Sequence, residues 1–145
     1  MAYTNKESQL LDALAKLMYD EFTSAVEVLW GPPDTARASH WFEVSLVDSE
    51  PVDQAAFYVA RRYRFQILYL MRNSGDQSLQ RQRERYEVAA RMQRFLIDYT
   101  QYATSAWFDG RIGSIEYGYR PPDRQDDNLT GVLIEWSCTV PESIS

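Results

Sequence analysis

The chain of 145 residues is 45% hydrophobic and carries a formal net charge of −6 at pH 7. This length is enough for one domain with its own core, and the ordinary hydrophobic fraction argues against a disordered chain. No stretch reaches the ~18 apolar residues that a membrane span needs, and the N-terminal residues lack the features of a signal peptide. We therefore expect residues 1–145 to form a single domain that folds in a cytoplasm without membrane contact.

The N-terminal part of the chain predicts one helix and one short strand. Thr4 and Glu7 form a capping box, and apolar residues follow at helical spacing as far as Phe22, which indicates an amphipathic helix. The stretch AVEVLW (25–30) alternates as a short strand does, and the turn sequence GPPD (31–34) ends it.

Two further strands are predicted before the middle of the chain. HWFEVSLV (40–47) alternates as a strand, and DSEPVDQ (48–54) is predicted to be an acidic turn. A long strand follows from about Ala56 to Arg72. One of its faces is uniformly large and apolar, which predicts that this face lies in the core. The residues on that face are Tyr63, Phe65, Ile67, Tyr69 and Met71.

The second half of the chain predicts a helix and two strands. Apolar residues at helical spacing indicate a helix from Ser78 to Tyr99. RIGSIEYGY (111–119) and TGVLIEWSCTV (130–140) are predicted strands, joined by the loop 120–128. The order is therefore helix, three strands, helix, two strands. It predicts an α+β fold with a mainly antiparallel sheet of about five strands and two principal helices packed on one face.

The second face of the 56–72 strand is neither polar nor apolar. Leu68 and Leu70 lie between Arg64 and Arg72, which gives an apolar centre with a charged rim, as at protein interfaces. We predict a subunit interface at Arg62, Arg64, Leu68, Leu70 and Arg72. The alternative is that the second helix covers both leucines within the same chain, and the strand alone does not decide between the two.

Charge is segregated along the sequence. Residues 1–60 carry ten acids and three bases, residues 61–94 carry nine arginines and three acids, and residues 95–145 carry eight acids and three bases. Arginine suits bidentate ion pairs at interfaces. One interpretation is a solvated surface, and the other is that the basic patch of one subunit docks on an acidic patch of its neighbour.

Residues suited to catalysis or metal binding are few. His40 and Cys138 are the only residues of their types, which predicts no disulfide framework, no zinc site and no cofactor. The glycines do not have phosphate-loop spacing, and the acidic pairs lack the spacing of a calcium loop. The arginine-rich segment could bind nucleic acid, but the chain is acidic overall and contains no recognised reading motif. A subunit interface is the better use of these arginines.

The element order resembles that of phage tail terminator proteins, also called tail completion or head–tail joining proteins. The resemblance covers most of the chain and rests on element order, length and texture. The stretches that carry it are LLDALAKLMYDEF, HWFEVSLVDSEP, RRYRFQILYL, RMQRFLIDY, RIGSIEYGY and LTGVLIEWSCTV.

The resemblance implies a structural virion protein with no enzymatic activity. Such a protein forms a homo-hexameric ring on the completed tail tube, ends tube polymerisation and offers a docking surface to the head connector or stopper protein. It would lie at the head-proximal end of the tail, and in the host cytoplasm before assembly. DNA passes through the ring, and a negative lumen would let it slide without sticking. Candidate lumen or docking-loop residues are Asp48, Glu50, Asp53, Asp123, Asp126 and Asp127.

Three alternatives remain open at this point. The chain could be another ring protein of the neck, such as a connector adaptor or stopper. It could instead be a small α+β enzyme, which would need His40, Cys138 or an acidic pair to converge in space. The third alternative is a nucleic-acid binder, which salt-sensitive retention on DNA would reveal.

Overall fold

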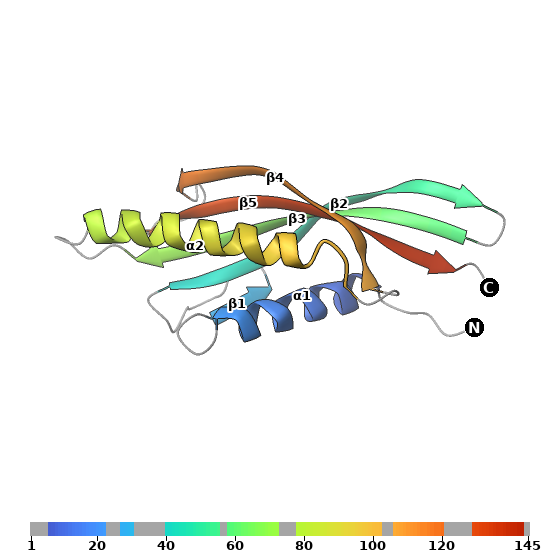
Figure 1. Ribbon diagram of the computed structural model, residues 1–145, viewed down its shortest axis with the longest axis horizontal. Helices are drawn as coiled ribbons and strands as arrows, with labels where there is room; N and C mark the ends of the chain where they lie inside the picture. The colour runs from blue at the N-terminus through green and yellow to red at the C-terminus, as the bar shows by residue number, and fades with distance from the viewer. Residues whose placement is uncertain are drawn as a thin grey trace.

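The computed structural model describes residues 6–22, 27–30, 40–55, 58–72, 78–102, 106–120 and 129–143. Within these ranges the chain forms two long helices and five strands (Figure 1). They are, in order, α1 (Lys6–Phe22), β1 (Glu27–Trp30), β2 (His40–Ala55), β3 (Tyr58–Arg72), α2 (Ser78–Asp98), β4 (Phe108–Tyr119) and β5 (Leu129–Ser143). The predicted capping residue Thr4 lies outside the described residues.

The strands form one sheet in the order β1-β2-β3-β5-β4. The four long strands β2, β3, β5 and β4 pair antiparallel. The four-residue strand β1 instead pairs parallel with the start of β2, with Glu27 opposite Trp41. The predicted α+β class, with an antiparallel sheet and two helices, is confirmed at the level of the four long strands.

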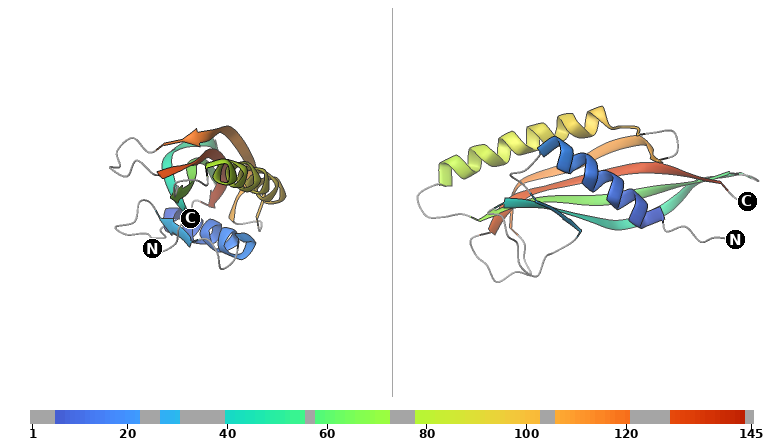
Figure 2. Two further views of the ribbon diagram at one scale, coloured as in Figure 1. Left: turned by 90° about the vertical axis from the view of Figure 1, so that its left-hand side faces the viewer. Right: turned by 90° about the horizontal axis from the view of Figure 1, so that it is seen from below.

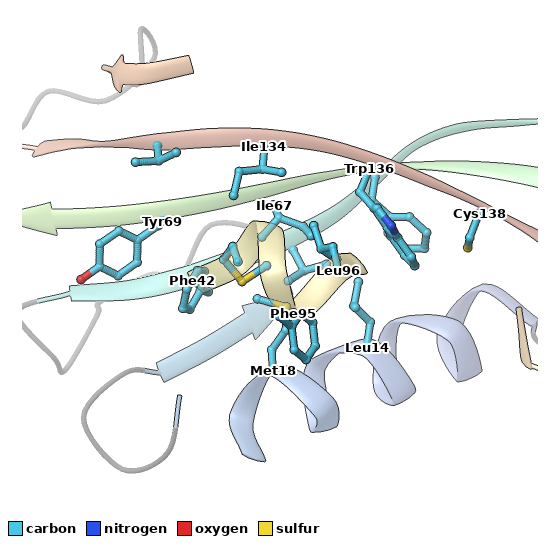
Figure 3. Packing of buried hydrophobic residues seen from close by; sticks show 14 of the residues in the cluster. Leu14, Met18, Phe42, Ile67, Tyr69, Phe95, Leu96, Ile134, Trp136 and Cys138 are labelled. Carbon is cyan, nitrogen blue, oxygen red and sulfur yellow. The ribbon is translucent and has the colours of Figure 1, made fainter. Parts of the chain in front are cut away.

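Both helices pack on the same face of the sheet, as the two views of Figure 2 show. α1 contacts β1 and β2, whereas α2 contacts β4 and β5. Between helices and sheet lies one large core, seen from close by in Figure 3. The face of β3 predicted to be buried lies in this core. Its side chains Tyr63, Phe65, Ile67, Tyr69 and Met71 are each at most 2% exposed.

The predicted acidic turn at 48–54 is wrong, because β2 continues through it to Ala55. Asp48 pairs with Arg64, and Glu50 pairs with Arg62, across a long antiparallel hairpin. Two register shifts, between Leu46 and Asp48 and between Pro51 and Asp53, absorb the irregular sequence. Bulges and an edge position are where a strand tolerates proline. The hairpin extends beyond both helices (Figure 1).

Candidate assembly surfaces

The face of the sheet opposite the helices is called the outer face here. It consists of the side chains that alternate with the core residues, and strand register fixes its rows. One row crosses the sheet from Asp48 through Arg64 and Ser137 to Arg111. The next row joins Gln66 to Glu135. Within the described ranges no helix covers this face, since both helices contribute to the core on the other side. It holds most of the predicted interface residues.

Arg62 is anchored within its own chain. Its guanidinium donates hydrogen bonds to Ser137 Oγ at 2.6 Å, to Thr139 Oγ1 at 3.1 Å and to Asp109 Oδ2 at 3.2 Å. Only 16% of the side chain is exposed. Asp109, which has a φ of 52°, also accepts a hydrogen bond from Arg111 at 3.2 Å. Arg62 therefore ties β3 to β5 and β4, and most of its donors are used before any partner arrives.

Arg64 and Asp48 form a bidentate ion pair across the β2–β3 hairpin. The hydrogen bond from Arg64 holds the pKa of the Asp48 carboxyl below its ordinary value. The same bond to Asp48 raises the pKa of Arg64. From the sequence, Arg64 was predicted at a subunit interface and Asp48 in a lumen or docking loop. The structure brings them together on one exposed patch of the outer face.

Leu70 is fully buried, so its place in the predicted interface is wrong. It packs with Trp41 and Leu129 in a second, smaller cluster, and half-buried Leu68 lies against them. The indole of Trp41 donates a 2.7 Å hydrogen bond to Glu43. The alternative cover, by the second helix, is also wrong. Neighbouring strands supply the apolar partners on this face, because β2 and β5 flank β3 there.

The structure describes only part of the remaining predicted residues. Glu50 is exposed on β2. Asp53 and Arg72 lie in β2 and β3, but their side chains are outside the described part of the structure. Asp123, Asp126 and Asp127 fall in 121–128, which lies outside the described residues. The lumen set therefore stays a prediction.

A hollow of about 310 Å³ opens on the outer face. Val47 and Arg64 line it from β2 and β3, whereas Gly113 and Glu135 line it from β4 and β5. The space exists partly because Gly113 lacks a side chain, since a Cβ there would approach Glu135 Cβ at 3.3 Å. Val47 is 54% exposed, which is high for a large apolar side chain. Sequence reasoning missed this hollow because four strands build it.

A second exposed surface lies on α2, on the opposite side of the sheet from the hollow. Ile97 is 63% exposed and Tyr86 is 49% exposed. The ring of Tyr86 packs edge-on against Tyr117 of β4, with centroids 5.7 Å apart. The isoleucine could have been found in the sequence, because it falls beside the helical stripe that contains Phe95 and Leu96.

The alternative of an enzyme needed His40, Cys138 or an acidic pair to converge, and His40 and Cys138 do not converge. His40 is opposite Met71 and Cys138 is opposite Tyr63, eight residues apart on β3. At 3.3 Å per residue the two backbones are separated by about 26 Å along the strand. Burial also raises the pKa of the Cys138 thiol to about 12, which keeps it protonated and a poor nucleophile.

In the part of the chain that the structure describes, no three histidine, cysteine or acidic side chains are arranged to hold a metal ion. None of the described helices is long and apolar enough to cross a bilayer.

No protein-family model matches this chain, and no curated protein matches it. Among solved structures it is similar to one determined by cryo-EM, the sheath/tube terminator of an extracellular contractile injection system, PVC, in the extended state. The TM-score is 0.61 and the sequence identity is 14%. The likeness covers 99% of this chain and 58% of that chain, so this chain spans little more than half of its neighbour's length. The comparison shows a shared fold.

Proposed function

We propose that this chain is a structural tail protein that terminates a tail tube. The observation that carries the proposal is the shared fold with a sheath/tube terminator, which extends over nearly the whole of this chain. The proposed form is a homo-hexameric ring at the head-proximal end of the tail. Its proposed partners are the tail tube protein and the head connector or stopper, and DNA passes through the ring without specific binding.

Two different faces on one domain suit such a ring. A head-to-tail ring requires a heterologous interface, in which two different surfaces of each subunit meet. This domain has helices on one side of its sheet, and on the other a hollowed face that no described helix covers. If each subunit places its helix side on the outer face of the next subunit, each of its two surfaces is used once. The contact then repeats around the ring and leaves no edge subunit.

Termination follows from a ring whose two ends differ. The end that meets the tube presents a surface like the one that each tube ring offers to the next. The opposite end lacks the surface that would accept another tube ring, so growth stops there. That end is then available to the head connector. This mechanism is steric and electrostatic, and it requires no catalytic group.

Light scattering across a concentration series, repeated with purified tail tubes and followed by electron microscopy, tests the proposal. We expect a species of about six subunits, or density at one end of each tube. The control is the same protein mixed with portal-bound heads without tails, because binding there alone would indicate a connector adaptor or stopper. A monomer that ignores tubes at every concentration would refute tail termination.

A further inference from the structure

We propose that the hollow on the outer face is the receptor for residues Arg94 to Asp98 of α2 from a second copy of this chain. The proposal rests on the proposed function, because it names the two surfaces that close the ring. Ile97 would enter the hollow between Val47 and Gly113. Arg94 would pair with Glu135 on the rim.

The exposed end of α2 has the form of an inserting surface. Ile97 projects from the helix with 63% of its surface exposed, while its neighbours Phe95 and Leu96 are buried in the core. Burying such a side chain in an apolar setting is worth roughly 1.5–3 kcal/mol. Arg94 is exposed one helical turn earlier, and no described residue forms an ion pair or hydrogen bond with it. An exposed isoleucine beside an arginine that no described residue pairs with is therefore left for a partner.

The hollow offers the complementary groups. Its apolar wall is the exposed side chain of Val47, and its β4 side is open at Gly113. Glu135 lines the hollow and is exposed, and among described residues it forms no hydrogen bond or salt bridge. Its carboxylate is therefore available to a cation from outside. Arg64 beside it attracts this carboxylate only at longer range, because the hydrogen bonds of its guanidinium go to Asp48 in a bidentate pair.

A second charge pair fits the same spacing. Asp98 follows Ile97 on α2 and is exposed, and Arg111 is 69% exposed on β4. Among described residues Arg111 donates only to Asp109, which it shares with Arg62, so donors remain on its guanidinium. Arg94 and Asp98 are four residues apart, about 6 Å along a helix. Glu135 and Arg111 lie two residues and one strand apart, about 8 Å by strand geometry. The two pairs can therefore form together.

A second copy fits the hollow better than other occupants because both surfaces belong to every chain and lie on opposite sides of the sheet. The contact is heterologous, so an interface that used it would propagate from copy to copy and close when the rotation permits. The charges on the two surfaces are complementary in both pairs. Such pairs across an interface determine register and suppress wrong partners.

The test is a charge exchange. Arg94→Glu and Glu135→Arg should each weaken self-association by about tenfold or more, and the double variant should recover most of that loss. Ile97→Ala should weaken it by about tenfold. Lys16→Glu makes the same charge change at an exposed site on α1, and it should leave association unchanged. All these side chains are exposed, so each monomer should keep its melting temperature. Sedimentation velocity gives the association constants. If the chain assembles only on a tube, the occupancy of tube ends is measured instead.

The outcomes separate this inference from the proposed function. Singles that weaken association and an exchange that restores it support the contact. Singles that behave as wild type, while wild type still caps tubes, overturn the contact and leave tail termination standing. An exchange that fails to restore association overturns the pairing of Arg94 with Glu135. Wild type that neither self-associates nor binds tubes overturns both proposals.

Discussion

Gly131→Ala should disrupt the sheet where β5 pairs with β3 at Leu70. A Cβ at Gly131 would lie 1.9 Å from the backbone oxygen of Tyr69 and 3.0 Å from Leu70 Cδ2. The first atom belongs to the backbone of the central strand, so no side-chain rotation relieves the overlap. Either β5 moves away from β3 or the local register shifts, and both expose part of the two apolar clusters.

The expected cost is about 3 kcal/mol, at the upper end of what forced overpacking causes. For a domain of this length that corresponds to a fall in melting temperature of roughly 10 °C. Gly118→Ala is the matched control, because a Cβ at Gly118 meets nothing within 4 Å. It should be neutral, or stabilise by up to about 1 kcal/mol through the unfolded chain.

Thermal unfolding followed by circular dichroism measures both variants under identical conditions. We expect opposite, or at least clearly separated, shifts in melting temperature for the same chemical change in two adjacent strands. If Gly131→Ala melted within about 2 °C of wild type, the close approach of β5 to β3 at Tyr69 would be refuted. The register that places Gly131 opposite Leu70 would then be wrong as well.

Two further predictions concern the core. Phe95→Ala should lower the free energy of unfolding by about 3–5 kcal/mol, because the ring is 3% exposed and its centroid lies 5.0 Å from that of Tyr99. Ile97→Ala, two residues away and exposed, should lower it by under about 0.5 kcal/mol. Urea unfolding measures both. A Phe95→Ala variant as stable as Ile97→Ala would contradict the core assignment. Cys138 should resist thiol reagents until the chain unfolds. The pKa of the Cys138 thiol in the folded chain, about 12, exceeds its value in the unfolded chain. The protonated thiol therefore contributes fully to the free energy of unfolding below about pH 8.5. That contribution is lost as pH rises towards 12, by up to about 1.4 kcal/mol per pH unit. Cys138→Ala should remove this part of the dependence of the free energy of unfolding on pH. An unchanged dependence would refute the burial of the Cys138 thiol.

Periodicity predicted the fold well because burial on one face is a local property of sequence. The alternation from Tyr63 to Met71 requires one buried face whatever packs on it. The same holds for α2, where Met92, Phe95 and Leu96 enter the core. In such elements the side-chain pattern and the tertiary contacts select the same structure, which is why few boundaries moved by more than two or three residues.

Composition was misleading where cross-strand pairing decides the structure. Asp48, Glu50 and Pro51 are typical of a turn, yet they continue β2, because Arg64 and Arg62 lie opposite the two acids. The pairing that stabilises them is about 12 to 16 residues away in sequence. The burial of Leu70 has the same origin, since its partners Trp41 and Leu129 come from flanking strands. No window of local sequence contains that information.

The charge segregation of the sequence has a different meaning in space. Arg62 pairs with Asp109, Arg64 with Asp48, and Arg91 with Glu21 at 3.0 Å, so bases of the middle segment meet acids of both flanking segments inside one chain. The guanidinium of Arg91 also lies 4.7 Å from the ring centre of Phe22.

Three arginines of the basic segment are therefore paired within the chain before any neighbour arrives. Among the charges that remain exposed, Arg94 on α2 and Glu135 on the outer face are the best matched pair. Exposed charges of this kind contribute little alone, since water and salt screen them, and more when an apolar contact excludes water around them. Ile97 in the hollow would supply that exclusion. The apolar contact and the ion pairs then depend on each other, and single residues of the charged segments, Arg94 and Glu135, bring two copies together rather than the segments as a whole.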